Sequence, residues 1–373
     1  MGVKMGIVGL PNVGKSTLFN ALTKTAAAQA ANFPFCTIEP NVGDVAVPDP
    51  RLDQLAELAK SANVIPARMS FVDIAGLVKG ASQGEGLGNQ FLGNIRSTDA
   101  IVNVVRCFES EDITHVDGSV NPVRDIETIH TELVLADTQT VEKAQARYTK
   151  LMKSAQKEMP KILEMLDALY THLQALKPAR SFDWESYVGD VNAVAEAYRD
   201  LHLLTAKPAI YVCNVEEEMA DGATDNEHTT AVKNFAKAEG ASVLLLCGKL
   251  EEELSVMDEA DKLEMIKDLG MTEPGLNGLI RLGYETLKLQ TYFTAGEKEV
   301  RAWTIHTGDK APAAAGKIHS DFERGFICAE VFTVPELMSA GSKAKLKESG
   351  KVRTEGRDYI VVDGDVMEFR FNV

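Results

Sequence analysis

An apolar run followed by a glycine-rich loop near the N-terminus places the strongest constraint on the fold of this chain. Residues 5–8 predict a short buried strand, residues 9–16 (GLPNVGKS) follow at once, and residues 16–22 have helical spacing. The loop fills every fixed position of the G-x-x-x-x-G-K-[ST] pattern, in the strand–loop–helix context that the pattern requires. The sequence therefore predicts an α/β domain with a site for nucleotide phosphates.

The residue types of this loop suit the chemistry of phosphate binding. Gly9 and Gly14 let the backbone turn so that successive amide N–H groups point at an anion. The helix that follows adds the positive end of its dipole. Lys15 is predicted to reach the β- and γ-phosphates of a nucleotide, and the hydroxyl of Ser16 is predicted to bind Mg²⁺.

The composition agrees with an ordinary globular protein. With 373 residues the chain has room for two or three domains, each with its own core. No apolar run approaches the roughly 18–20 residues of a membrane span, and the chain enters its first strand too early for a signal peptide. The five cysteines are isolated from one another, which argues against a disulfide framework and fits a reducing compartment. We therefore expect a cytoplasmic protein without membrane contact.

The charge is unevenly distributed. A formal net charge of −16 speaks against a surface that is basic throughout, as many nucleic-acid-binding proteins have. Near the C-terminus, however, residues 343–357 contain six Lys or Arg and only two Glu. Such a run is usually a solvated face, and contact with RNA is the alternative for this one.

Two segments after the loop have the pattern of a nucleotide-dependent switch. Residues 32–40 contain prolines near both ends, which disfavour a helix, and Thr37 lies where P-loop hydrolases carry a threonine for Mg²⁺ and the γ-phosphate. The apolar run 69–72 leads into residues 73–76 (DIAG), in which the Asp is expected to hold Mg²⁺ and the Gly amide to sense the γ-phosphate. The glycine-rich stretch 79–88 follows, and we expect a ligand to order it.

The group that would activate water is not defined by these motifs. Many hydrolysing P-loop proteins carry a Gln directly after the D-x-x-G pattern, whereas this chain has Leu77, which cannot polarise water. Either hydrolysis is slow or another group acts. His115, which follows the predicted strand 100–105, is the polar candidate, and a surface histidine without a catalytic role is an equal alternative.

A later strand carries the residues expected to read the base. Residues 208–213 are apolar and lead into residues 214–217 (NVEE), where a GTP-specific protein carries N-K-x-D. The Asp of that motif accepts hydrogen bonds from guanine donors that adenine lacks. Here Val215 replaces the Lys and the longer Glu217 replaces the Asp, while Asn214 offers both an acceptor and a donor to adenine. Specificity for guanine should be lost or reversed, and the chemistry alone leaves both outcomes open.

Residues 133–204 depart from the α/β pattern. Apolar side chains recur there at alternating spacings of four and three, over 162–176 and again over 187–201, which is a heptad seam. We predict that these two arms form an antiparallel helical hairpin inserted into the P-loop domain. Two amphipathic helices that lie on the sheet are the alternative.

The last part of the chain predicts a small α+β domain. Residues 300–305 and 359–362 have strand-like composition, and a helix is expected near 312–324. A turn at Asp363-Gly364 precedes a final alternating strand.

Taken together, these motifs resemble the YchF / Obg-like ATPase family of P-loop proteins over essentially the whole chain. The resemblance rests on residues 9–16, 32–40, 73–88 and 214–217 and on the helical insertion. Residues 289–373, with 293–296 (FTAG), 300–305 and 363–365 (DGD), look like the TGS domain of that family, which has a ubiquitin-like β-grasp fold. The implied architecture is an α/β P-loop domain of residues 1–132 and 205–280, a helical hairpin (coiled coil) at 133–204, and a C-terminal TGS domain.

The resemblance also implies an activity and a set of site residues. Family members prefer ATP to GTP, hydrolyse it slowly with Mg²⁺ and associate with the ribosome, for which we expect the large subunit. Carried over by position, the nucleotide-binding residues are Asn12, Val13, Gly14, Lys15, Ser16, Thr17, Gly76, Asn214, Val215 and Glu217, and the Mg²⁺ residues are Ser16, Thr37 and Asp73. In some relatives with a hydrophobic residue in the place of Leu77, a loop Asn like Asn12 helps to hold K⁺, which stays open for this chain.

We therefore predict an ATPase that works as a molecular switch on the ribosome, with Lys15 and His115 as catalytic candidates and RNA contact through the TGS domain. ATP would order the loops that carry Thr37 and Gly76, and hydrolysis would release them. Two alternatives remain. One is an Obg-type GTPase, and the other is a non-hydrolysing adenine-nucleotide sensor, which Leu77 favours.

Overall fold

The computed structural model describes most of the chain, namely residues 2–30, 41–74, 87–110, 115–116, 118–151, 158–188 and 192–372. Within these ranges the backbone divides into two compact units, one of residues 2–25, 41–43 and 70–279 and one of residues 26–30, 44–69 and 280–372. None of the helices in the described ranges is both long and apolar enough to span a bilayer.

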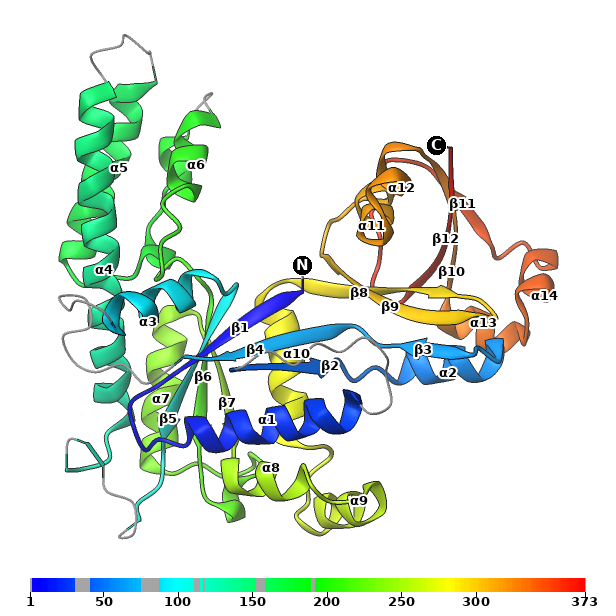
Figure 1. The fold of residues 1–373 in the computed structure, drawn as a ribbon, viewed down its shortest axis with the longest axis horizontal. Coiled ribbons are helices and arrows are strands. Elements are labelled where there is room, and N and C mark those ends of the chain that lie inside the picture. The colour runs from blue at the N-terminus through cyan, green and yellow to red at the C-terminus, as the bar shows by residue number, and fades with distance from the viewer. Residues whose placement is uncertain are drawn as a thin grey trace. The chain divides into compact units, whose positions relative to one another are not determined.

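A six-stranded sheet forms the centre of the first unit (Figure 1). Its strands lie in the order β2-β4-β1-β5-β6-β7, and the pairs β1–β5, β5–β6 and β6–β7 are parallel. The strands are β1 Val3–Val8, β2 Val42–Ala46, β4 Arg68–Asp73, β5 Ala100–Arg106, β6 Ala209–Asn214 and β7 Ser242–Leu246. Every residue of β5 and β6 is buried, as in parallel sheets that helices cover on both faces. The loop after β1 leaves the sheet at its carboxyl edge, where ligands bind in open α/β folds.

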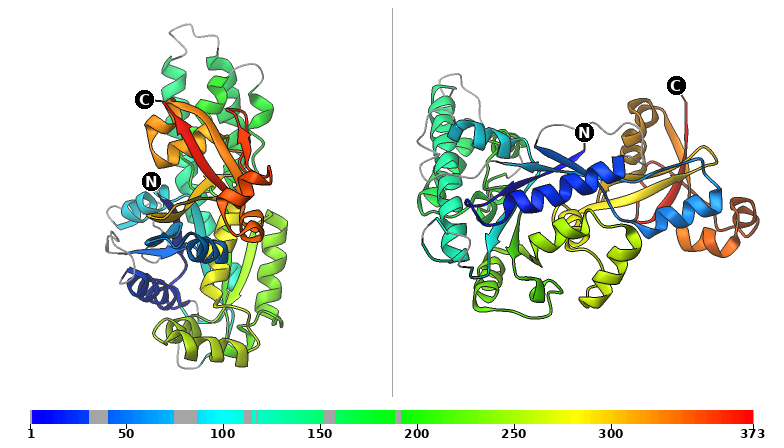
Figure 2. Two further views of the ribbon diagram at one scale, coloured as in Figure 1. Left: turned by 90° about the vertical axis from the view of Figure 1, so that its right-hand side faces the viewer. Right: turned by 60° about the horizontal axis from the view of Figure 1, so that its bottom comes forward.

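Helices lie between β1 and β2, between β4 and β5 and between β6 and β7, because parallel strands need long crossover connections, and further helices follow β7 (Figure 2). They are α1 Lys15–Ala30, α3 Leu87–Arg96, α7 Glu227–Glu239, α8 Gly248–Leu254, α9 Glu259–Asp268 and α10 Gly275–Thr286. Local sequence signals set the ends of α7. Asn226 and Thr229 form a reciprocal capping box at its start, and Gly240, with φ of 66°, ends it.

A helical insertion extends from the first unit between β5 and β6 (Figure 1). It consists of α4 Pro122–Leu151, α5 Met159–Gln174 and α6 Asn192–Arg199, with 3₁₀ turns at Ala179–Ser181 and Glu185–Tyr187. Helix α5 packs against both α4 and α6. The seam predicted over 162–176 is confirmed at Ile162, Leu166, Leu169 and Leu173, which are all buried in one core. It is wrong at Leu176, which is exposed and lies beyond the end of α5.

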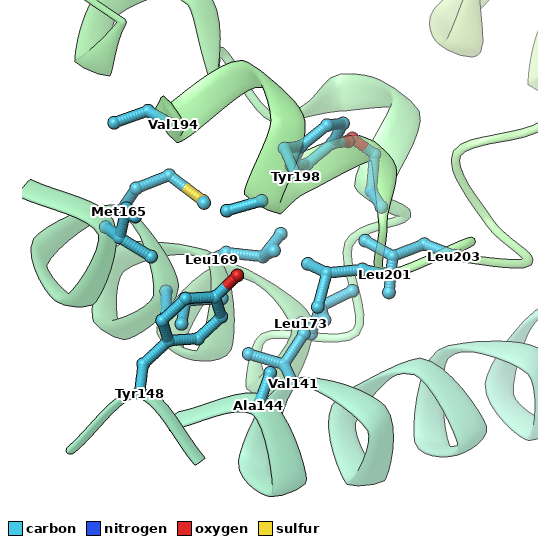
Figure 3. Packing of buried hydrophobic residues seen from close by; sticks show 14 of the residues in the cluster. Val141, Ala144, Tyr148, Met165, Leu169, Leu173, Val194, Tyr198, Leu201 and Leu203 are labelled. Carbon is cyan, nitrogen blue, oxygen red and sulfur yellow. The ribbon is translucent and has the colours of Figure 1, made fainter. Parts of the chain in front are cut away.

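The insertion differs from the predicted hairpin in its first arm. The main partner of α5 is α4, which begins at residue 122 rather than 133, and the second predicted seam forms only the short helix α6. The buried positions of α4 that share this core include Val141, Ala144 and Tyr148, and Figure 3 shows them beside Leu169 and Leu173. Their seam is harder to see in the sequence because small and polar residues occupy much of the buried face of α4.

Asp137 fixes the return of the chain from the insertion to the sheet. Its carboxylate, which is almost completely buried, accepts hydrogen bonds from the amides of Leu204 and Thr205, both at 2.8 Å, and from the Thr205 hydroxyl at 2.6 Å. Three donors satisfy this buried carboxylate, as the cost of burying a charge requires. The root of the insertion is therefore tied to the segment that enters β6.

A second polar cluster lies between the insertion and the sheet. The Glu239 Oε2 atom accepts hydrogen bonds from Arg180 Nη2 at 2.6 Å and from the Tyr211 hydroxyl at 2.7 Å. The His130 Nε2 atom lies 3.1 Å from each of these two donor atoms. Burial lowers the pKa of His130 from 6.5 to about 4, and the nearby Arg180 cation acts in the same direction.

We expect this cluster to make stability depend on pH. Between pH 6.5 and 4 the unfolded chain binds a proton at His130 that the folded protein does not, so the free energy of unfolding falls as the pH falls. The difference in pKa corresponds to roughly 3 kcal/mol. Urea unfolding of wild type and of His130→Gln at several pH values should show this loss in the wild type alone. His306→Gln, at an exposed histidine, should retain the wild-type slope, and an unchanged slope in His130→Gln would contradict the assignment.

The second unit has a mixed sheet with the strand order β11-β10-β12-β8-β9-β3. Strands β8 and β9 form an antiparallel pair, β12 lies parallel to β8, and β10 is antiparallel to β12. The elements are α2 Pro50–Ala59, β3 Asn63–Ile65, β8 Leu289–Ala295, β9 Glu299–His306, α11 Ala311–Ile318, α12 Ser320–Arg324, β10 Phe326–Thr333, α13 Val334–Ala340, α14 Lys343–Glu348, β11 Arg353–Glu355 and β12 Asp365–Phe371. This mixed sheet with its helices confirms the predicted α+β domain.

Residues 44–69 belong to the second unit, although the predicted boundaries assigned them to the P-loop domain. Strand β3 adds to the edge of the second sheet by pairing in parallel with β9. Arg51 of α2 donates to Asp49 at 2.7 Å and to Asp363 at 2.7 Å, and its guanidinium lies over the Phe293 ring. The contacts with Asp363 and Phe293 join residues far apart in the chain, so local patterns do not reveal them.

The strand predicted at 359–362 is not formed. Val361 is buried while Ile360 and Val362 are exposed, so the burial of these residues alternates as in a strand. The segment nevertheless has a single bridge, from Ile360 to Lys310, because it runs beside the loop before α11 and not beside a strand. The predicted turn at Asp363-Gly364 and the strand after it are confirmed as the entry to β12.

Candidate functional site

The loop between β1 and α1 has the backbone that phosphate binding needs. A Cβ atom at Gly9 would lie 2.5 Å from the carbonyl oxygen of Val104, so only glycine fits there. Lys15 is 8% exposed, and its Nζ atom donates to the carbonyl of Leu10 at 2.8 Å. The lysine is thus folded back over its own loop. Burial lowers the pKa of Lys15, and the charge of Asp73 opposes this.

Asn214 joins the loop to the segment that was predicted to hold the base. Its Nδ2 atom donates to the carbonyl of Val13 at 3.0 Å, and its Oδ1 atom accepts from the amide of Gly248 at 2.9 Å. Gly14 has φ of 102°, and a Cβ atom on it would lie 2.2 Å from Asn214 Nδ2. One side chain at the end of β6 therefore sets the spacing between the phosphate loop and the turn before α8.

The rest of the predicted base segment continues from this point. Val215 is 1% exposed, and its amide donates to the carbonyl of Leu246 at 3.0 Å. Glu217 begins a short 3₁₀ turn, Glu217–Met219, and is exposed. Its charge is close enough to the Cys247 thiol, together with Glu251, to add to the rise in the pKa of Cys247 that burial causes.

Ser16 and Asp73 offer oxygen ligands of the kind that Mg²⁺ takes. Ser16 is exposed at the start of α1, and Asp73 ends β4 close enough to Lys15 for the two charges to interact. Burial raises the pKa of Asp73, and Lys15 opposes this rise. The described residues contain no cluster of three or more His, Cys, Asp or Glu.

His115 is buried and forms a hydrogen bond with Asp125 rather than lying on the surface. Its Nε2 atom is 2.9 Å from Asp125 Oδ2, and both side chains are at most 3% exposed. Nearby, the Arg106 side chain donates to the carbonyls of Phe108 and Ser110 in the loop after β5. The alternative of a plain surface histidine is therefore wrong, and a catalytic role for His115 stays a prediction. The partner Asp125 was missed, although an Asp in the first turn of a long helix is a recognisable signal.

Several predicted residues cannot be placed. Thr37, Gly76 and Leu77 lie outside the described residues, as does most of the glycine-rich stretch 79–88. The other residues carried over for the phosphates are described, with Asn12 exposed at φ of 63° and Val13 buried. The structure brings together the P-loop, Asp73 and Asn214, and the roles of all these residues stay predictions.

The basic stretch 343–357 is partly neutralised. Lys343 pairs with Glu330 at 3.0 Å and also with Glu368, and Lys347 pairs with Glu330 at 3.4 Å. Arg353 pairs with Asp365 at 3.4 Å and with Glu355 at 3.6 Å. Fewer cations of this stretch are available to a partner than its sequence suggests.

The strand–loop–helix at the carboxyl edge of a parallel sheet, its buried lysine and the aspartate at the end of β4 define a P-loop nucleotide-binding protein. Comparison with known proteins agrees. Residues 4–137 match the family described as 50S ribosome-binding GTPase, and residues 289–372 match the YchF GTPase C-terminal family, described as a protein of unknown function (DUF933).

Full-length relatives define the family more narrowly. The chain is 53% identical to the ribosome-binding ATPase YchF of Pasteurella multocida and 50% identical to that of Bacillus subtilis, over 100% of both chains in each case. The solved structure of the Schizosaccharomyces pombe YchF GTPase is similar, with a TM-score of 0.86 and 38% identity over 99% of this chain and 98% of that one. The chain belongs to the YchF family.

Proposed function

We propose that this protein is a Mg²⁺-dependent ATPase that prefers ATP to GTP, hydrolyses it slowly and works as a nucleotide-controlled switch on the ribosome. Two relatives that match over their whole length are named ribosome-binding ATPases, and the family that matches the P-loop domain is described as 50S ribosome-binding, which favours the large subunit. This partner implies a cytoplasmic protein.

The base preference is carried by the residues after β6. Asn214 is held between the P-loop and Gly248, so an adenine or guanine ring would meet a fixed amide. The lysine of the guanine-selective motif is replaced by the buried Val215, and its aspartate by the longer Glu217. A carboxylate facing adenine N1 would repel it, so Asn214 would have to read the adenine edge while Glu217 turns away.

Different residues would bind the phosphates, Mg²⁺, the attacking water and K⁺. The loop amides and Lys15 would hold the β- and γ-phosphates, with Lys15 exchanging the Leu10 carbonyl for a phosphate oxygen. Ser16, Asp73 and Thr37 would hold Mg²⁺, which when bound neutralises charge on the phosphates. His115 would orient the attacking water, with its ring held by Asp125. Asn12, exposed in the loop, would supply an oxygen to K⁺.

Parallel titrations of ATP and GTP test the proposal. With slowly hydrolysed analogues in Mg²⁺ and K⁺ buffer, we expect ATP to bind at least about tenfold more tightly, which is roughly 1.4 kcal/mol. A preference for GTP would mean that Glu217 still reads guanine and would favour an Obg-type GTPase. ATP binding with turnover no greater than that of Lys15→Ala would favour a non-hydrolysing sensor.

Ribosome association can be tested by sedimentation with purified ribosomes, in the presence and absence of ATP. RNA contact through residues 343–357 is the part of this proposal that concerns the second unit. Three cations of this stretch, Lys345, Lys351 and Arg357, form no ion pair within 4 Å with a described carboxylate. Replacing these three by Gln should weaken sedimentation if the second unit contacts RNA.

A further inference from the structure

The part of α4 farthest from the sheet carries an uncompensated basic surface. Residues 143–161 contain six Lys or Arg and a single Glu, in a chain whose net charge is −16. Four of these cations are described, and all four are exposed, namely Lys143, Arg147 and Lys150 of α4 and Lys161 of α5. We call these four residues the basic tip.

Helical geometry gathers three of these cations on one face. At about 100° per residue, Lys143, Arg147 and Lys150 lie within an arc of roughly 60°. Val141, Ala144 and Tyr148, which are at most 9% exposed, lie on the face that packs against α5. The cations therefore point away from the core of the insertion, and a rise of about 1.5 Å per residue spaces them along roughly 10 Å of helix.

Nothing in the described part of the protein neutralises this face. No ion pair within 4 Å joins any of the four cations to a described carboxylate. Asp167 of α5 accepts a hydrogen bond from Gln145 at 2.7 Å, and Glu142 of α4 forms no ion pair with these cations within 4 Å. The Arg147 guanidinium carbon lies 4.8 Å from the centroid of the Tyr148 ring, and the residue is exposed.

The position of the basic tip separates it from the acidic body of the protein. Asp137 is the last residue of α4 with a described hydrogen bond to the segment that enters β6. Arg147 is ten residues farther along the same helix, which is about 15 Å. This is almost twice the Debye length of about 8 Å at physiological ionic strength, so an anion at the tip is largely screened from the net negative charge.

We propose that the basic tip binds the phosphate backbone of an RNA helix. The inference rests on the proposed ribosome association and assigns the contact surface and its chemistry. RNA is favoured over a protein partner because the stripe is cationic throughout and lacks the aromatic or apolar anchors that protein interfaces use. It is favoured over a membrane because the apolar face of α4 is buried against α5 and cannot enter lipid.

The test compares two triple variants of the full chain. Lys143→Gln, Arg147→Gln and Lys150→Gln remove the stripe, whereas Lys237→Gln, Lys267→Gln and Lys317→Gln remove three other exposed cations near the ends of other helices. Sedimentation with purified ribosomes is measured over a series of KCl concentrations, and basal ATPase activity and thermal unfolding verify that both variants are folded.

We expect the tip variant to bind ribosomes at least about tenfold more weakly, and the slope of log affinity against log salt to fall by about two to three. Binding of the control variant should match wild type. Equal binding by wild type and the tip variant would overturn the proposal while leaving ribosome association intact. Failure of the wild type to sediment would instead overturn the proposed function.

Competition with protein-free ribosomal RNA decides the chemical class of the partner. RNA that displaces wild type from ribosomes, and that binds the tip variant correspondingly less, supports a contact with the phosphate backbone. If such RNA does not compete although the tip variant has lost ribosome binding, the stripe binds an acidic protein and the RNA assignment is wrong.

Discussion

Replacing Lys15 by Ala should abolish most of the ATPase activity without unfolding the protein. The Lys15 ammonium is buried inside the phosphate loop and held by the carbonyl of Leu10, so it is positioned before any nucleotide arrives. After exchanging the Leu10 carbonyl for a phosphate oxygen, this ammonium would stabilise the transferring phosphoryl group. Loss of one such donor typically lowers kcat about 10²- to 10³-fold. Steady-state phosphate release with ATP and Mg²⁺ measures the effect.

A second lysine on the same helix supplies the control. Lys24 of α1 is partly exposed and pairs with Glu252 at 2.7 Å, which is worth little for a pair near the surface. Lys24→Ala should therefore keep wild-type turnover and change stability by less than about 1 kcal/mol. Turnover in Lys15→Ala equal to that of Lys24→Ala would show that the loop does not carry the hydrolysis.

The phosphate loop could be predicted completely because its information is local. Gly9, Gly14 and Lys15 are within a few residues of one another, and the strand and helix around them follow from the same stretch. The bridge made by Asn214 could not be predicted in the same way. It connects residues about two hundred positions apart, and its existence depends on β6 ending beside β5 and β1.

The same distinction explains the errors in the fold. Heptad spacing predicted α5, whose buried face is made of large aliphatic side chains, but it did not show where α4 begins. The assignment of residues 44–69 to the second unit depends on the pairing of β3 with β9, which lies more than two hundred residues away in the chain. The surroundings of His115 show a third limit. A polar residue in a loop is usually expected to be exposed. Only the fold shows that His115 is buried and lies against Asp125.

Gly14→Ala should weaken ATP binding strongly, because two separate costs meet at this position of the loop. The backbone at Gly14 has φ of 102°, which an L-residue adopts at a cost of roughly 1–3 kcal/mol. The new Cβ atom would also lie 2.2 Å from Asn214 Nδ2 and displace a side chain that makes two hydrogen bonds, each worth roughly 1 kcal/mol. We expect the loop to move to relieve these costs and so to lose its phosphate-binding geometry, with a loss of affinity of about 100-fold or more, measured by calorimetric titration with a slowly hydrolysed ATP analogue.

A double-mutant cycle separates the two causes. Asn214→Ala removes the Nδ2 atom that the new methyl group would meet. In that background, the effect of Gly14→Ala should come only from the backbone strain, which is roughly 1–3 kcal/mol. Gly43→Ala is the matched control, because its Cβ atom would meet Leu22 and Thr23 at an ordinary 3.6 Å and should leave ATP affinity near wild type. If Gly14→Ala lowers ATP affinity by the same factor with and without the Asn214 side chain, then Asn214 does not set the spacing between the phosphate loop and the base segment. A smaller loss of affinity in the Asn214→Ala background would instead show that the Asn214 side chain couples the phosphate loop to the segment predicted to hold the base.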